Sequence, residues 1–209
     1  VDAVFEAFMA ALDAAGGAYI KDDGPIIDKL WPNGHLNPKI MAQDADKMLA
    51  EFGLTDLPDN TEFLAVETTG IGKDHPLSGE KLSRVAALYR ATDFEDAVTK
   101  TAAIQAHLGA GHSVGLHSTD DARAMTLAKA IPTSRVIVNQ AHCFATGGAF
   151  NNGMPFSLSM GCGSWGGNSI DDNVHWKHFM QTTKIVREIP AREPAVEDIF
   201  ADYWDASAT

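Results

Sequence analysis

Apolar residues recur along this chain with two different periods, and the longer period predicts its helices. Phe5, Phe8 and Leu12 are spaced as on one helix face, and Gly16 ends that run. Asp93 is placed to cap a later helix, whose first turn holds two acidic residues. In chain order, helices are expected over about 4–15, 25–30, 44–52, 94–108, 119–130 and 194–204.

The compact apolar runs between these helices predict strands. Strands are expected over 62–67, 84–90, 113–117 and 135–139, and a late alternating strand over 181–188. From residue 84 to residue 139, strands and helices follow one another in turn. Because this order is typical of a parallel sheet covered by helices, we expect an α/β fold.

Residues 140–168 break the pattern, because they are rich in Gly, Asn and Ser and show little periodicity. A long irregular segment inside a compact domain usually has a function. There is also no acidic residue between Asp121 and Asp171. This window either leaves room for an anionic ligand or is buried core, and the pattern leaves both interpretations open.

Composition narrows the class of protein. The chain has 209 residues and a formal net charge of −12, which argues against binding to nucleic acid or to an anionic membrane. We find neither an apolar run of about 20 residues nor a basic leader at Val1. Two cysteines do not make a disulfide framework, so a reducing cytoplasmic location is expected.

The most distinctive part of the chain is residues 161–169, which read Gly-Cys-Gly-Ser-Trp-Gly-Gly-Asn-Ser. Other segments fit the same family in the same order: Glu-Lys-Leu-Ser at 80–83, Asp-Phe-Glu-Asp-Ala-Val at 93–98, Gly-His-Ser at 111–113 and Arg-Val-Ile-Val-Asn at 135–139. Together they resemble the C-terminal half of the CoA-acylating aldehyde dehydrogenases, including the aldehyde dehydrogenase domain of bifunctional aldehyde–alcohol dehydrogenases. Residues 150–169 and 190–204 look most like acylating sulfoacetaldehyde dehydrogenases.

The resemblance implies a fold and a reaction. It implies a three-layer catalytic domain over 1–180, followed over 181–209 by an oligomerisation strand and a helical tail. In this family a cysteine attacks the aldehyde, a hydride passes to NAD or NADP, and coenzyme A takes the acyl group. Family members carry that cysteine and a Rossmann cofactor domain upstream of the segment matching this chain. The chain is therefore expected to be an inactive fragment that lacks both.

The resemblance also implies site residues. Glu80 and Leu82 match cofactor-binding positions, and a carboxylate can accept hydrogen bonds from both ribose hydroxyls. His112 matches a histidine that serves as acid or base near the CoA thiol. The alternatives are an exposed loop glutamate and a structural histidine. The substrate set comprises Asn139, Phe150, Ser157, Trp165 and Arg84.

Arg84 stands where relatives usually have proline. A fixed cation there suggests pairing with a sulfonate or phosphate, although a strand-edge arginine that faces solvent is the simpler interpretation. The irregular loop holding Phe150, Ser157 and Trp165 is expected to form a substrate pocket or a tightly packed connection.

Two other functional classes stay open. Cys143 follows His142, which suggests a small cofactor-independent hydrolase, but neighbours on a strand point to opposite faces. The second is a non-catalytic interaction module, in which the segment from Gln181 to Glu188 pairs with another subunit as an edge strand. The histidine spacings match no metal motif, so no metal site is expected.

Overall fold

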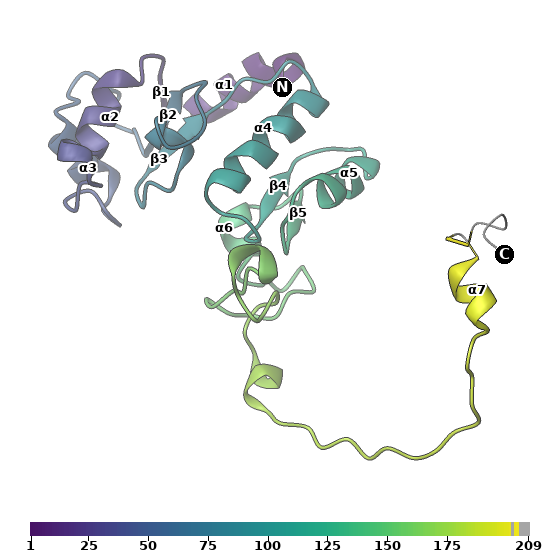
Figure 1. The fold of residues 1–209 in the computed structure, drawn as a ribbon. Coiled ribbons are helices and arrows are strands. Elements are labelled where there is room, and N and C mark those ends of the chain that lie inside the picture. The colour runs from purple at the N-terminus through teal and green to yellow at the C-terminus, as the bar shows by residue number, and fades with distance from the viewer. Residues whose placement is uncertain (202, 205–209) are drawn as a thin grey trace. The chain divides into compact units, whose positions relative to one another are not determined.

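The computed structural model describes residues 1–201 and 203–204 (Figure 1). The chain divides into two compact units, Val1–His175 and Trp176–Thr209. The expected domain boundary at residue 180 is not tested by this division and stays a prediction. Among the described residues, no helix is both long enough and apolar enough to cross a membrane.

The first sheet of the Val1–His175 unit has three parallel strands in the order β1-β2-β3. Its strands are β1 (Gly17–Ile20), β2 (Phe63–Glu67) and β3 (Val85–Leu88), and the accompanying helices are α1 (Phe5–Ala14), α2 (Gly24–Leu30) and α3 (Ala45–Phe52). Side chains from α2 and α3 pack on β2 and β3 in one core, which includes the fully buried Leu30, Phe52 and Leu64. Burial of these apolar side chains is the main force that holds the helices to the sheet.

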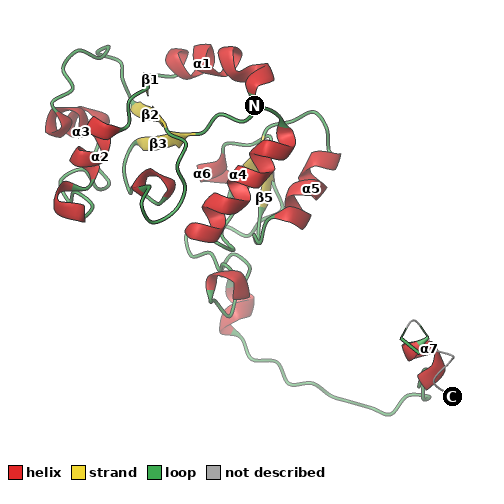
Figure 2. Cartoon of the chain, turned by 45° about the horizontal axis from the view of Figure 1, so that its top comes forward, coloured by secondary structure: helices red, strands yellow, loops and turns green. Residues whose placement is uncertain are grey.

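The second sheet pairs β4 (Val114–Leu116) with β5 (Val136–Val138), again in parallel. Helices α4 (Phe94–His107) and α5 (Ala122–Ala130) lie beside this pair in both views (Figures 1 and 2). Val98 of α4 and Leu127 of α5 share a buried core with Val114 and Leu116. Asp93 caps α4 as predicted, because its carboxylate accepts a 2.9 Å hydrogen bond from the Asp96 N–H.

The remaining elements are short. They are α6 (His142–Ala145), α7 (Val196–Phe200) and the 3-10 turns η1 (Asp2–Val4), η2 (Pro32–Gly34), η3 (Pro76–Ser78), η4 (Ser164–Gly166) and η5 (Trp176–Phe179). Helix α7 lies inside the predicted helix 194–204, of which Asp202 falls outside the described residues.

The structure confirms the α/β class with parallel strands and corrects several details. The strands form two separate parallel sheets instead of one, and β1 was missed because Gly16 and Gly17 read as a helix stop. This strand position needs a glycine because a Cβ at Gly17 would lie 2.7 Å from Cγ of Leu12 on α1. The expected strand over 181–188 has no regular structure, since no neighbouring strand pairs with its backbone groups in this single chain.

Close packing explains much of the glycine in the irregular loop. A Cβ at Gly161 would collide with the Ile170 carbonyl, and one at Gly148 would lie 2.7 Å from the Pro155 carbonyl oxygen. The loop is also less irregular than expected, because α6 and η4 form within it. These approaches favour the tightly packed connection over an open pocket for this part of the loop.

Candidate functional site

A cavity of about 680 Å³ lies between the two sheets of the Val1–His175 unit. One wall comes from β3, the residues just after it and the turn that carries Glu80 and Lys81. The opposite wall comes from the end of α4, the His112–Ser113 pair before β4, and His142 at the start of α6. Glu80 and His112, two residues named by the family resemblance, thus line the same cavity.

Three side chains on the second wall form a continuous hydrogen-bonded chain. Nδ1 of His112 lies 2.7 Å from the Ser113 hydroxyl, which lies 2.8 Å from Nε2 of His142. Burial lowers the pKa of the His142 imidazole below its usual range, and the neighbouring His112 and His117 lower it further. His142 is therefore neutral near pH 7.

A buried arginine fixes the backbone of this wall. Arg135 is only 4% exposed, and its guanidinium donates from NH1 to the His112 carbonyl at 3.2 Å and to the Gly161 carbonyl at 2.9 Å. Its Nε donates to the side-chain oxygen of Asn173 at 3.0 Å, and Asn173 is fully buried. Gly111 is needed beside it, because its φ is +81° and a Cβ there would meet the Cys162 carbonyl.

The opposite wall presents one carboxylate and one amine. Nζ of Lys81 donates to the carbonyls of Leu77 at 2.8 Å and of Gly79 at 2.6 Å, which folds the amine back on its own turn. Burial lowers the pKa of Lys81 below its usual range, and the nearby Glu80 carboxylate offsets only part of this lowering. Glu80 is exposed at the cavity wall, and no hydrogen bond or ion pair from the described residues occupies its carboxylate.

Several predicted site residues lie outside this cavity. Arg84 pairs with Asp44 at 2.9 Å and with Glu62 at 2.8 Å on the surface, so its charge is already balanced. Asn139 bonds the backbone of Ser118 in both directions, accepting from its N–H at 2.9 Å and donating to its carbonyl at 2.8 Å. Leu82 is 47% exposed and adopts a left-handed φ of +42°. Their binding roles stay predictions.

The loop residues are also apart from the cavity. Phe150 is fully exposed and contacts Phe156 in a tilted arrangement with ring centroids 5.0 Å apart, and Trp165 is 54% exposed in η4. The Ser157 hydroxyl donates to the Ser159 carbonyl at 3.0 Å and closes a local turn. Their substrate roles likewise stay predictions.

Cys143 is exposed and absent from the cavity wall, and it lies with His142 on helix α6, not on the expected strand. The His142 ring is engaged by Ser113, and no hydrogen bond among the described residues joins it to the Cys143 thiol.

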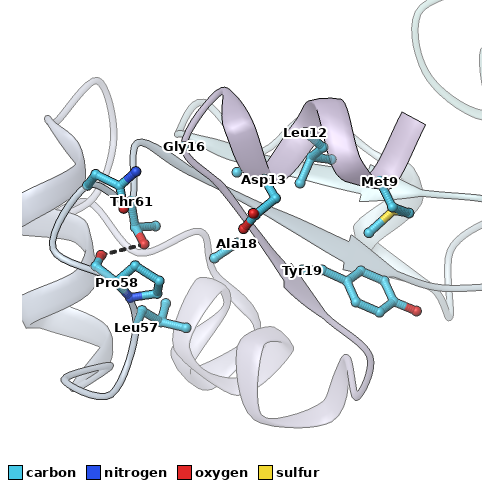
Figure 3. A pocket seen from close by; sticks show the side chains of 11 residues that line it. Met9, Leu12, Asp13, Gly16, Ala18, Tyr19, Leu57, Pro58 and Thr61 are labelled. Atoms are coloured by element: carbon cyan, nitrogen blue, oxygen red, sulfur yellow. Dashed lines mark hydrogen bonds between the residues drawn. The ribbon is translucent and has the colours of Figure 1, made fainter. Parts of the chain in front are cut away.

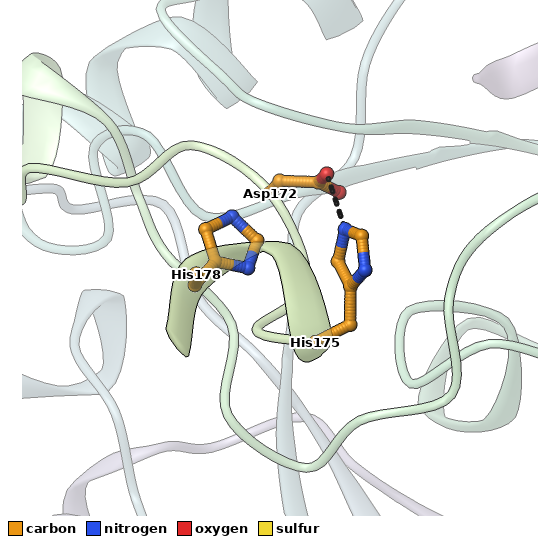
Figure 4. Close-up of side chains that lie close together, drawn as sticks. All are labelled: Asp172, His175 and His178. Carbon is orange, nitrogen blue, oxygen red and sulfur yellow. Dashed lines mark ion pairs between the residues drawn. The ribbon is translucent and has the colours of Figure 1, made fainter. Parts of the chain in front are cut away.

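Two further features fall outside the predicted set. A smaller cavity of about 220 Å³ lies among α1, β1 and residues 57–61, where the Thr61 hydroxyl donates to the Pro58 carbonyl at 2.7 Å (Figure 3). His175 lies 3.5 Å from Asp172, an ion pair when the imidazole is protonated (Figure 4). Neither feature contains Glu80 or His112.

Sequence reasoning missed Ser113, His142 and Arg135 as members of the site. Ser113 and His142 are 29 residues apart, and only the pairing of β4 with β5 brings their elements together. Arg135 could have been suspected, because it is one of three charged residues in the acid-free window.

Comparison with known proteins finds relatives in sequence and in structure, although no family model matches the chain. It is 45% identical over 207 residues to an acylating sulfoacetaldehyde dehydrogenase from Cupriavidus necator, a match covering 98% of this chain and 42% of that protein. It is 36% identical to a bifunctional aldehyde–alcohol dehydrogenase from Escherichia coli, covering 90% of this chain and 22% of that protein.

A solved structure shares the fold. An acetylating aldehyde dehydrogenase from Geobacillus thermoglucosidasius superposes with a TM-score of 0.80 at 29% identity, covering 91% of this chain and 43% of that one. The chain spans less than half the length of each of these relatives. Across nearly all of its own length, however, it matches the sulfoacetaldehyde dehydrogenase in sequence and the acetylating aldehyde dehydrogenase in structure, and it therefore belongs to the acylating aldehyde dehydrogenase family.

Proposed function

We propose that the full-length protein containing this chain oxidises an aldehyde with NAD or NADP and transfers the acyl group to coenzyme A. The observation that carries this proposal is the shared cavity of Glu80 and His112, which lie 32 residues apart in sequence. The chain spans about 42% of its sulfoacetaldehyde dehydrogenase relative. In this proposal the nucleophilic cysteine and the cofactor domain belong to residues outside the chain, and the chain alone is inactive.

The residues present fit a nicotinamide nucleotide. The Glu80 carboxylate is exposed at the cavity, and it can accept from both hydroxyls of a ribose. The cavity volume of about 680 Å³ is within the range of small-molecule sites. When bound, the nicotinamide would supply the hydride acceptor, and Glu80 would orient its ribose.

His112 is suited to proton transfer because its ring lines the cavity while Nδ1 is engaged by Ser113. Nε2 is then the nitrogen available to the reacting groups. In the acyl-transfer step Nε2 of His112 would accept the proton of the CoA thiol as the sulfur bonds to the thioester carbon and the cysteine thiolate leaves.

Sulfoacetaldehyde is the aldehyde we propose, and its support is the 45% identity to an acylating sulfoacetaldehyde dehydrogenase. An oligomer paired through residues 181–188 and a cytoplasmic location complete the proposal. Solved structures that share this fold include an engineered glycolyl-CoA reductase with bound NADP+ and a propionaldehyde dehydrogenase with bound CoA, which fits the two co-substrates proposed here.

The test is an assay of the full-length protein with sulfoacetaldehyde, CoA and NAD+ or NADP+, following reduced nicotinamide and acyl-CoA. Glu80→Gln is expected to raise KM for the nicotinamide about tenfold, because a charged hydrogen-bond acceptor is lost. His112→Ala is expected to lower kcat at least about 100-fold through loss of the base.

Glu95→Gln is the matched control, since Glu95 is exposed on α4 and outside the cavity. Its kinetic constants are expected to equal those of the wild type. The proposal is wrong if the full-length protein forms no acyl-CoA from any aldehyde, or if Glu80→Gln and His112→Ala behave like this control.

A further inference from the structure

The chain His112–Ser113–His142 contains one serine hydroxyl between two imidazole nitrogens. A hydroxyl has a single hydrogen and two lone pairs, so it can donate to only one of the two rings. The tautomers of the two histidines are therefore coupled through Ser113. When the Ser113 hydroxyl donates to one ring, the other ring has to be the donor.

We propose that His142 is a positioning residue, which acts through the Ser113 hydroxyl to hold His112 with its hydrogen on Nδ1 and its Nε2 free to accept a proton. In this arrangement Nδ1–H of His112 donates to Ser113, and the Ser113 hydroxyl donates to Nε2 of His142. The role of His112 as a base rests on the proposed function, but the tautomer does not.

Proton uptake separates the two arrangements that the geometry allows. In the proposed one, His112 can become an imidazolium at Nε2 while every hydrogen bond keeps its direction. In the opposite one, Nδ1 of His112 is an acceptor, so protonation there would force the serine hydroxyl to give up that hydrogen bond and turn away. A preorganised chain avoids that rearrangement during the reaction.

The acceptor role requires a neutral His142. Its pKa is lowered, first by burial and then by electrostatic interaction with the neighbouring His112 and His117. The other titratable groups on the cavity wall are Glu80, Lys81 and Tyr89. A neutral His142 has one unprotonated nitrogen and can therefore offer Nε2 as the acceptor for the Ser113 hydroxyl, which an imidazolium could not do.

The backbone is shaped to seat the His142 ring. Gly115 of β4 lies beneath it, and a Cβ at that position would come within 2.9 Å of Nδ1 of His142. Gly115 does not have a positive φ, so glycine is needed there because space is limited and not because of backbone conformation. The substitution Gly115→Ala would therefore displace the ring without removing a hydrogen-bonding group.

The direct test is ¹⁵N NMR of the histidine rings in the full-length protein. The wild type is expected to carry the His112 hydrogen on Nδ1, and His142→Phe to release it toward Nε2. His142→Gln is expected to restore the Nδ1–H form, because the Gln carbonyl can accept from Ser113. A hydrogen on Nε2 of His112 in the wild type, or no change in His142→Phe, would overturn the proposal.

Kinetics distinguish positioning from a purely structural role. His142→Phe is expected to lower kcat of acyl transfer about tenfold while KM for CoA changes by less than about twofold. In a His112→Ala background the same substitution is expected to have no further effect. An equal loss in both backgrounds would show that His142 does not act through His112.

Gly115→Ala keeps the test decisive if His142→Phe does not fold. It is expected to shift the His112 tautomer in the same direction, and an unchanged tautomer would count against the proposal. His35→Phe, at an exposed histidine outside the cavity, is the matched control and should leave the tautomer intact. The expected tautomer in a protein without acyl-CoA activity would refute the proposed function and leave this inference standing.

Discussion

At the scale of single residues, polar side chains in this chain are held by backbone groups more than by one another. Arg135, Lys81 and Asn139 each bond main-chain carbonyls. Sequence could name Glu80 and His112 through family resemblance, because their motifs are local. It could not name the partners of His112 from spacing, since the Ser113–His142 contact depends on how two strands meet.

The lowered pKa of His142 predicts how stability depends on pH. The unfolded chain binds a proton at His142 near pH 6.5, whereas the folded chain binds it only at lower pH. Between these two values the unfolded state holds more protons, so the free energy of unfolding rises with pH across that window. Below the pKa of His142 in the folded state the whole loss of unfolding free energy remains, and above pH 6.5 this loss is absent.

His142→Gln removes this titration, so its unfolding midpoint in urea is expected to rise less steeply than the wild type between the folded pKa and pH 6.5. His35→Phe, at an exposed histidine outside the cavity, is the control for the loss of a histidine elsewhere in the chain. Parallel curves for wild type and His142→Gln would contradict the prediction.

At the scale of elements, sequence succeeded where local chemistry decides and failed where distant packing does. Helices α3 and α4 were predicted, and local residues mark their ends: Gly53 adopts a left-handed φ of +65° at the end of the first, and Asp93 caps the start of the second. Strand β1 was missed because its glycine reflects the proximity of Leu12 on α1. The cavity between the β3 and β4 walls has no local signature.

The cap of α4 provides a test at this scale. Asp93→Ala removes the acceptor of the Asp96 N–H and is expected to lower the free energy of unfolding by about 1 kcal/mol. Asp93→Asn keeps an acceptor oxygen and should lose only a fraction of that. Denaturant unfolding of the three proteins measures the difference, and equal midpoints would show that the cap contributes nothing.

At the scale of the whole molecule, residues 181–188 are the clearest divergence between sequence pattern and structure. They alternate as a strand would, yet Ile185 and Val186 are 79% and 87% exposed and carry no regular structure. An unpaired strand leaves its backbone groups to water, so such a pattern can form a strand only against a partner. The sequence shows the alternation, and among the described residues no strand pairs with this segment.

This pattern predicts an oligomer that depends on backbone pairing. Ile185→Pro removes an N–H donor and is expected to shift the full-length protein to a smaller assembly in sedimentation velocity. Ile185→Val keeps the donor and a β-branched side chain, so its sedimentation should match the wild type. A wild-type mass for the proline variant would exclude pairing through this residue.

The carbonyl anchoring of Arg135 bears on tolerance to acid. An arginine held by carboxylates loses its partners when those groups take up protons, but amide oxygens bind no proton in that range. The Arg135 contacts to His112, Gly161 and Asn173 use amide and peptide oxygens alone. Acidification that loosens the surface pairs of Arg84 would leave this anchor in place, so the His112 and Gly161 carbonyls would still be held by Arg135 after the Arg84 pairs are lost.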